Sequence, residues 1–219
     1  MVEDLNSSMD NKLTSLFNQL EAQLGDQFNS IFIRKKYKKG AYLLRQGETS
    51  ENYFFLEKGG IARIFIENGE VELTAGFIFP YEFGGCLVGS LLNQPACYTI
   101  RLLTDTYVRI FSRKDYEGIK QKHTVATLIE ETIIGNSIQK LFNKSNEFRY
   151  LTAKERYFWL INSQPHLISY IPMGYIAQYL GVTAECLSRI RADIKSMPVY
   201  DVISTTELVL AKCKSKKKH

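Results

Sequence analysis

The chain lacks any apolar run long enough to cross a membrane, since a membrane-spanning helix needs about 20 consecutive apolar residues. It also lacks a secretory signal, because its first residues, MVEDLNSSMDNK, show no basic segment followed by an apolar one. Wholesale disorder is excluded as well, because hydrophobic residues make up 45% of the 219 residues, which is enough to bury a core. We therefore expect a soluble, cytoplasmic protein without a membrane partner.

Cysteine and histidine are scarce. The four cysteines include no C-x-x-C pair, and the three histidines lie far apart, so neither residue type shows the spacing of a metal site. The cysteines are also too few for a disulfide framework, which suits a reducing compartment. No phosphate-cradling loop and no recognisable nucleophile with its base occurs. The sequence therefore predicts neither a metal nor another cofactor, and an enzyme is the least expected class.

Positive charge is concentrated near the C-terminal end. Residues 1–150 contain 18 Lys and Arg against 18 Asp and Glu, whereas residues 151–219 contain 10 against 5. The excess equals the five lysines of residues 212–218. A basic tail beside a nucleic-acid-binding domain would raise affinity through counterion release without adding sequence preference. A solvated, frayed end is the alternative interpretation.

Apolar periodicity and glycine spacing divide the first half of the chain. Over residues 9–25, leucines and Phe17 recur at the spacing of one helix face, and Gly25 ends the predicted helix. Residues 28–111 contain short aromatic and β-branched runs separated by glycines, which predicts an all-β roll or barrel. The clearest hairpin is IARIFIENGEVEL, where Asn68 and Gly69 would adopt the positive φ angles of a two-residue primed turn.

A second helical pattern follows residue 112. Its apolar residues form two stripes about 100° apart around the helix axis, at positions 125, 128, 129 and 133 and at positions 134, 138, 141 and 142. A helix that is apolar over so wide an arc packs on two sides, which predicts a contact with the same helix of a second copy. Burial inside one monomer is the alternative. The polar residues 143–147 predict the end of this helix and a hinge.

The most informative segment is residues 172–195, PMGYIAQYLGVTAECLSRIRADIK. A capping box from Thr152 to Glu155 precedes it and predicts the start of another helix. Within the segment, apolar residues recur at the spacing that buries two short helices against each other. Gly181 lies between them, where glycine tolerates the left-handed conformation of a helix end. Thr183 is a suitable N-cap for the second helix. The pattern predicts a helix-turn-helix, with an ordinary helical hairpin as the alternative.

The second helix of this motif would present its outward face to DNA. The candidate DNA-binding residues are Thr183, Glu185, Ser188, Arg189, Arg191 and Lys195. Arg189 can bond guanine O6 and N7, and Glu185 can accept from a cytosine amino group. Thr183 and the N–H groups at the helix start can hold a phosphate, while Ser188 suits a base or a phosphate. Arg191 and Lys195 would add charge contacts. A surface ion pair is the alternative for Glu185 and Arg189.

Short motifs also occur in a characteristic order. LLRQGE at residues 43–48 and YFFLEKGGIARIFI at residues 53–66 precede the long helix and the helix-turn-helix. With these motifs the chain resembles the Crp-Fnr family of bacterial transcription regulators over nearly its whole length, and Glu185 and Arg189 match two base-contacting positions of that family. The resemblance implies an α+β fold with an N-terminal, jelly-roll-like β-roll of the cyclic-nucleotide-binding type, a long dimerisation helix and a C-terminal, winged-helix-like helix-turn-helix domain.

The same resemblance gives the domain organisation and the partners. The implied domains are an N-terminal helix over residues 1–27, a sensor roll over 28–111, a dimerisation helix and hinge over 112–146, and a DNA-binding domain with a basic tail over 147–219. The implied partners are double-stranded DNA, a second copy in a homodimer, RNA polymerase and a small-molecule effector. No glycine-centred wing is evident after the second helix, so residues 196–211 predict a short strand or helix instead.

Two features depart from the family pattern. Ala184 stands where the family often has a basic or polar contact residue, so the operator should differ. Members that bind a cyclic nucleotide use a glutamate for the ribose and an arginine for the phosphate, but residues 83–100 here contain no charged residue. A buried phosphate without a cation bears a desolvation penalty of several kcal/mol, so cyclic AMP is not the expected effector. Members that sense oxygen through an iron–sulfur cluster carry cysteines near the start of the chain, whereas the first cysteine here is Cys86. An iron–sulfur cluster is therefore not expected.

The segment expected to line the effector pocket contains Gly84, Gly85, Cys86, Cys97 and Tyr98. It would hold an apolar or neutral effector, or be vestigial. Cys86 and Cys97 would form a thiol switch if their Cα atoms lay within about 7 Å, with two small apolar side chains as the alternative.

The leading hypothesis is a homodimeric, sequence-specific DNA-binding regulator whose roll senses a signal other than a cyclic nucleotide. A cyclic-nucleotide-responsive regulator is one alternative. A ligand-binding module that acts through a protein partner is another, and it predicts inertness toward duplex DNA at low ionic strength.

Overall fold

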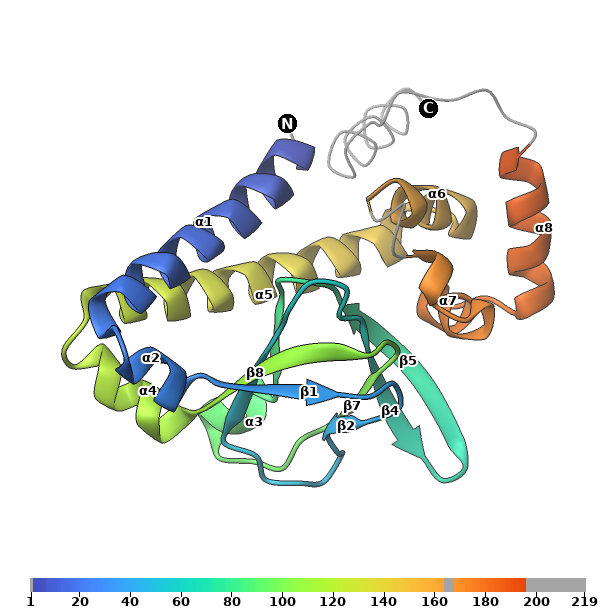
Figure 1. Ribbon diagram of the computed structural model, residues 1–219. Coiled ribbons are helices and arrows are strands. Elements are labelled where there is room, and N and C mark those ends of the chain that lie inside the picture. Colours follow the sequence, from blue (N-terminus) through green and yellow to red (C-terminus); the bar gives the residue numbers. More distant parts are fainter. Residues whose placement is uncertain (1, 164–167, 196–219) are drawn as a thin grey trace. The chain divides into compact units, whose positions relative to one another are not determined.

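The computed structural model describes residues 2–163 and 168–195, which fold into two compact units (Figure 1). The first unit comprises Asp10–Ile133. The second contains the described residues from Ile134 onward together with those before Asp10. Two helices, α1 (Val2–Leu24) and α5 (Thr124–Tyr150), contribute residues to both units. Among the described residues, no helix is both long enough and apolar enough to span a membrane.

The first unit is a roll of two antiparallel sheets. One sheet has the strand order β1-β8-β3-β6 and the other the order β2-β7-β4-β5. The strands are β1 (Ile33–Tyr37), β2 (Tyr42–Leu44), β3 (Asn52–Leu56), β4 (Ala62–Asn68), β5 (Val71–Ile78), β6 (Phe83–Gly85), β7 (Thr99–Leu102) and β8 (Thr106–Ser112). The short helices of this unit are α2 (Gln27–Ile31), α3 (Leu87–Leu92) and α4 (Arg113–Lys120). The expected α+β fold with an N-terminal β-roll is confirmed.

The β4–β5 hairpin turns one residue later than the sequence predicted. Asn68 pairs with Val71 as the last residue of β4, so the two-residue loop is Gly69 and Glu70. Within this loop only Gly69 has a positive φ, of 62°. A type II′ turn needs positive φ at its first position alone, and glycine satisfies that need. The prediction that Asn68 and Gly69 are the two central turn residues was therefore wrong.

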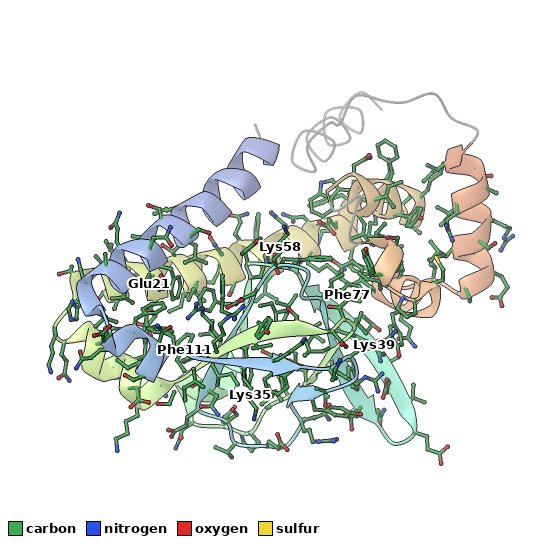
Figure 2. All side chains as sticks on the ribbon, in the orientation of Figure 1. Glu21, Lys35, Lys39, Lys58, Phe77 and Phe111 are labelled. Carbon is green, nitrogen blue, oxygen red and sulfur yellow. The ribbon has the colours of Figure 1, made fainter. Side chains whose placement is uncertain are left out.

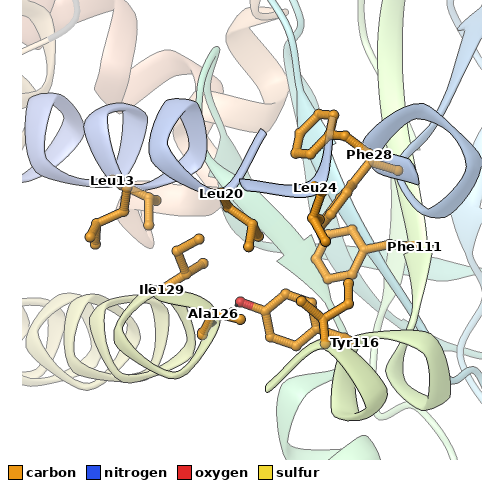
Figure 3. Close-up of a cluster of buried hydrophobic side chains, with 11 residues drawn as sticks. Leu13, Leu20, Leu24, Phe28, Phe111, Tyr116, Ala126 and Ile129 are labelled. Carbon is orange, nitrogen blue, oxygen red and sulfur yellow. Dashed lines mark hydrogen bonds between the residues drawn. The ribbon is translucent and has the colours of Figure 1, made fainter. Parts of the chain in front are cut away.

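Two apolar cores stabilise the roll. Aliphatic and aromatic side chains of both sheets fill the space between them. A second core lies on the outer face of the β1-β8-β3-β6 sheet, where α1, α2, α4 and the first turns of α5 cover it. Leu13 and Leu20 extend from α1 toward Ala126 and Ile129 of α5 in this second core (Figure 3). The leucine stripe predicted for the first helix is therefore confirmed as its buried face.

Helix α5 runs without a break to Tyr150, so the predicted helix end at residues 143–147 was wrong, and the hinge expected there stays a prediction. The segment is polar, but it contains neither glycine nor proline, and polar side chains alone do not stop a helix. The apolar residues of α5 differ in exposure along its length. Ala126 and Ile129 are fully buried, whereas Ile138, Leu141 and Phe142 are more than half exposed. The distal apolar stripe therefore faces solvent in the single chain.

The described part of the second unit is helical. After α5 come α6 (Ala153–Ser163), a short 3₁₀ helix (Ile168–Tyr170), α7 (Met173–Leu180) and α8 (Ala184–Lys195). The predicted capping box begins α6, because the Thr152 N–H donates to the Glu155 carboxylate at 2.7 Å and the Glu155 N–H donates to the Thr152 hydroxyl at 3.3 Å. Tyr157 and Leu160 of α6 are buried. The predicted element at residues 196–211 and the lysine tail lie outside the described residues.

Candidate nucleic-acid interface and sensor segment

The turn between α7 and α8 depends on Gly181. Its φ is 69°, in the left-handed region, and the Val182 N–H closes the end of α7 by donating to the Ala177 carbonyl at 3.0 Å. A Cβ at Gly181 would lie 3.3 Å from the Phe148 ring of α5. Backbone strain and close packing therefore both favour glycine, and the turn fixes the direction in which α8 leaves α7.

Helix α8 is capped by the threonine that the sequence predicted. The Thr183 hydroxyl accepts a hydrogen bond from the Cys186 N–H at 3.2 Å. Glu185 lies in the first turn, where hydrogen bonds from its own backbone N–H and from the Thr183 hydroxyl lower the pKa of its carboxyl. Its carboxylate therefore adds negative charge at the positive end of the helix dipole and is ionised at neutral pH.

The two faces of α8 differ sharply. Leu187 is fully buried and Ile190 nearly so, and both pack into the helical unit. The opposite face is exposed and contains Ala184, Glu185, Ser188, Arg189 and Ala192. Within the described part of the chain, Arg189 forms no ion pair, so the surface pair with Glu185 is not formed. The outer face therefore offers a guanidinium group without a carboxylate partner.

Arg191 and Lys195 are the two further predicted DNA-binding residues on α8. Arg191 is exposed, and its Nη1 donates to the Met173 Sδ of α7 at 3.0 Å. Lys195 is the last residue of α8. The structure therefore gathers all six predicted residues on one capped helix and the residue that caps it.

A buried polar network, which the sequence did not predict, lies beside the turn. The Lys144 ammonium group is 3.0 Å from the centre of the Tyr179 ring and donates to the Tyr179 carbonyl at 3.3 Å. Burial lowers the pKa of Lys144 to about 7. Burial likewise raises the pKa of Glu147, which is only 5% exposed. Both residues lie in the segment predicted to be a hinge. Their spacing of three residues, which makes them neighbours on a helix, was the sequence signal for this network.

Arg156 of α6 connects the same region to α7. Its guanidinium donates to the Leu151 carbonyl at 2.7 Å and to the Leu180 carbonyl at 2.8 Å, and it lies 4.4 Å from the centre of the Phe148 ring. The Leu180 carbonyl is one of those left unpaired at the end of α7. Arg156 therefore holds the start of α6 and the end of α7 together, directly before the turn that presents α8.

The predicted effector segment begins at β6 and continues into α3. A Cβ at Gly84 would lie 2.5 Å from the Ile78 Cδ1, and a Cβ at Gly85, whose φ is 146°, would lie 3.1 Å from the Tyr53 Cδ1. The Tyr98 hydroxyl donates to the Gly85 carbonyl at 2.6 Å, and burial raises the pKa of Tyr98. The structure therefore brings Tyr98 against Gly85, and neighbouring side chains already fill the space beside both glycines.

The two cysteines of this segment differ in environment. Both thiols are free, Cys86 is buried and Cys97 is exposed. The Cys86 Sγ packs so closely on α3 that a Cβ at Gly89 would lie 2.5 Å from it. Cys86 thus occupies the apolar position expected of a small buried side chain, and the thiol switch stays a prediction. Among the described residues, no three histidine, cysteine or carboxylate side chains gather as a metal site.

Sequence reasoning also missed a buried arginine on the neighbouring sheet. Arg63 of β4 is 0% exposed, its Nε donates to the Thr74 hydroxyl at 2.8 Å, and it pairs with the Glu72 carboxylate. Arg101 of β7 lies opposite Arg63 and is 3.7 Å from the same carboxylate. Two guanidinium groups thus lie on the outer face of the β2-β7-β4-β5 sheet. The available signal was Arg63 itself, the one charged residue in the run IARIFI.

Comparison with known proteins identifies the roll. Residues 34–123 match the family model of the cyclic nucleotide-binding domain. No curated protein matches the chain in sequence.

Several solved structures share the fold. The c-di-GMP-responsive global regulator CLP of Xanthomonas campestris is 15% identical, with a TM-score of 0.63 over 84% of this chain and 96% of that one. A CooA mutant from Carboxydothermus hydrogenoformans is 17% identical, with a TM-score of 0.61 over 80% and 81%. A CRP-family transcriptional regulator from Thermus thermophilus is 14% identical, with a TM-score of 0.57 over 80% and 94%. The chain therefore has the fold of CRP-type regulators.

Proposed function

We propose that the protein is a homodimeric, sequence-specific DNA-binding transcription regulator of the Crp-Fnr type. The observation that carries the proposal is α8, whose apolar face is buried while Glu185, Ser188 and Arg189 line its exposed face. A capped, outward-facing helix of this kind fits the major groove of DNA. The fold shared with CRP-type regulators supports the same conclusion. RNA polymerase is the further partner that such a regulator would contact.

The exposed face of α8 has the chemistry for base contacts. Arg189 has its guanidinium free for bidentate bonding to guanine O6 and N7. Glu185 would leave its contact with Thr183 to accept from a cytosine amino group, and the freed hydroxyl could then donate to a phosphate. Arg191 and Lys195 would bind phosphates, which adds affinity but no sequence preference.

Selection of bound sequences from a random duplex pool tests this function. We expect a two-fold symmetric consensus with half-sites about one helical turn apart. Arg189→Ala should weaken binding to the selected site by about 1–3 kcal/mol and leave binding to random DNA nearly unchanged. Arg191→Ala is the matched control on the same helix, because losing a phosphate contact weakens both duplexes equally. Equal losses for both variants would show that Arg189 binds only phosphate.

The exposed stripe on α5 supports the dimer. Ile138, Leu141 and Phe142 are 62%, 70% and 61% exposed and share one helix face, which matches the predicted self-contact. Leu141→Glu should convert a sedimenting dimer into a monomer and remove specific DNA binding. Leu92→Glu, at an exposed leucine of α3, is the control and should leave the dimer intact. A wild-type chain that sediments as a monomer at micromolar concentration would contradict the dimer.

We further propose that the effector is not a cyclic nucleotide. Residues 83–100 contain no charged residue, and Arg63 on the neighbouring strand is already neutralised by Glu72. Calorimetric titration with cyclic AMP and cyclic GMP should therefore give no binding. Saturable binding that is lost in Arg63→Met would favour a cyclic-nucleotide-responsive regulator instead, which the match of residues 34–123 supports.

A ligand-binding module that acts through a protein partner makes the opposite prediction for DNA. Its α8 would serve as a protein contact, and the chain would bind no duplex even at low ionic strength, where phosphate contacts are strongest. Titration of the full chain with random duplex at low and at physiological salt separates the two functions. A salt-dependent affinity supports the DNA-binding proposal, and no binding under either condition contradicts it.

A further inference from the structure

A cavity lies beside the roll, away from the predicted effector segment. Its volume is about 500 Å³, and it is bounded by α1, α2 and the outer face of the β1-β8-β3-β6 sheet. Glu21 of α1 and Lys58, which follows β3, both line it (Figure 2). The volume is within the range of small-molecule sites, about 300–1,000 Å³. Every lining residue belongs to the first unit, so the cavity is complete within the roll.

One wall of the cavity is aromatic. The Phe17 ring of α1 stacks on the Phe55 ring of β3 with centres 5.7 Å apart and an interplanar angle of 27°. Phe17 also meets Phe32 edge to face, with centres 5.7 Å apart. Tyr81 adds a fourth ring, 6.4 Å from Phe55. Rings from several elements thus offer flat apolar surfaces, which suit a planar apolar body.

The other wall carries three charged side chains, here named the pocket triad: Arg34, Glu57 and Arg109. The Arg34 Nε and Nη2 donate to the Glu57 carboxylate at 2.8 and 2.7 Å, and the Arg109 Nε lies 3.2 Å from it. Two guanidinium groups therefore share one carboxylate and leave one positive charge in excess. Lys58 and Glu21 cancel each other, so the cavity favours a single negative charge. Guanidinium groups suit a carboxylate in particular, because they can donate two parallel hydrogen bonds to it.

The position of Tyr81 is an independent indication. The Glu82 N–H donates to the Phe79 carbonyl at 3.2 Å, which closes a turn with Pro80 and Tyr81 at its centre. Tyr81 has a φ of 66°, at the turn position where glycine is preferred. The residue is 44% exposed and gains little from burial. Residues held in such strained conformations cluster at functional sites.

We propose that this cavity binds a small aromatic carboxylate. The ring of the ligand would lie against Phe17, Phe55 and Tyr81, and its carboxylate would bind the guanidinium groups of the pocket triad. Aromatic walls also favour quaternary or primary ammonium ligands. Such a cation would be repelled by the excess positive charge of the cavity, so it is disfavoured. Binding here requires only the roll and is independent of the DNA-binding function proposed above.

Calorimetric titration of the full chain with three matched probes tests the proposal. The probes are 1-naphthoate, neutral 1-naphthalenemethanol and cationic 1-naphthylmethylammonium, which share one ring system. We expect one naphthoate per chain, bound about tenfold more tightly than either other probe, because a charge-assisted hydrogen bond contributes that much. Arg34→Gln should remove most of this preference, because it removes one of the two guanidinium groups. The variant should still fold, since the Arg34 side chain is about half exposed and belongs to neither core.

The variant Tyr81→Gly isolates the aromatic wall without endangering the fold, because glycine suits the turn better. It should weaken the binding of all three probes by about fivefold, because one aromatic contact is lost, while the melting temperature of the protein stays the same or rises. Asn93→Gly, at the other non-glycine residue with positive φ among those described, is the matched control and should bind like the wild type. The proposal is overturned if the cation binds as tightly as naphthoate, if no probe saturates, or if both pocket variants bind like the wild type.

Discussion

Replacing Arg156 with alanine should destabilise the helical unit without touching the exposed face of α8 that is proposed to contact DNA. The side chain donates to the carbonyls of Leu151 and Leu180 at 2.7 and 2.8 Å and lies over the Phe148 ring. Alanine would leave both carbonyls without these donors. The Leu180 carbonyl matters most, because it belongs to the last turn of α7, and the direction of α8 depends on that turn.

The loss can be estimated from these contacts. A hydrogen bond from a charged donor contributes about 1.5–3 kcal/mol, and the contact with an aromatic ring about 0.5–2 kcal/mol. Part of this sum is offset, because burial lowers the pKa of Arg156 and its Nε finds no hydrogen-bond partner among the described residues. We therefore expect Arg156→Ala to lower the free energy of unfolding by about 3 kcal/mol. Arg156→Lys, which keeps the charge but cannot reach both carbonyls, should lose about half as much.

Urea unfolding followed by tryptophan fluorescence measures this loss, because the single tryptophan, Trp159, lies in α6 of the same unit. Arg189→Ala is the matched control, since Arg189 is exposed and should change stability by less than about 0.5 kcal/mol. The reasoning is refuted if Arg156→Ala unfolds at the same urea concentration as the wild type, or if both arginine variants lose equally.

Three further substitutions should change stability through burial or close packing. Burial lowers the pKa of Lys144 to about 7. The unfolded state, with a lysine pKa of about 10.4, therefore binds more protons between these values, and stability rises with pH there. Lys144→Met should remove that rise in urea unfolding at about pH 7 and about pH 10. A Cβ at Gly60 would lie 2.9 Å from the Thr106 hydroxyl, so Gly60→Ala should cost about 1–3 kcal/mol in circular-dichroism melts. Gly76→Ala, whose Cβ meets nothing closer than 3.8 Å, is its control. Leu20 is 0% exposed, so Leu20→Ala should cost about 3–5 kcal/mol, and a loss below 1 kcal/mol would contradict its place in the core.

Local signals predicted the elements, and long-range contacts decided what they missed. The turn at Gly181 and the caps at Thr152 and Thr183 depend on neighbouring backbone alone, so spacing was sufficient to find them. The predicted helix end at residues 143–147 was wrong for the opposite reason. Lys144 and Glu147 look like loop residues, but α5 continues through them, Lys144 donates to the Tyr179 carbonyl of α7, and Glu147 is buried. Their spacing of three suits a helix, whereas the contact with α7 joins residues 35 positions apart and is not encoded locally. The pocket triad joins β1, β8 and the residue after β3, which only strand order brings together.

The two sheets carry the same charge arrangement at different depths, and that difference predicts different energetics. On each outer face two arginines share one glutamate. Arg63 is completely buried beside Glu72, whereas Arg34 beside Glu57 is 46% exposed. Glu72→Gln would remove the negative charge that pairs with the buried Arg63 guanidinium, which costs about 3–5 kcal/mol. Glu57→Gln removes the shared negative charge beside an arginine that already contacts water, and should cost about 1 kcal/mol. Circular-dichroism melts of the two variants measure the difference, and equal losses would show that burial does not distinguish the two faces. By the same reasoning an anion must displace Glu72 to reach Arg63, while the pocket triad already borders an open cavity, so the second face is the one at which a carboxylate can bind without rearranging the sheet.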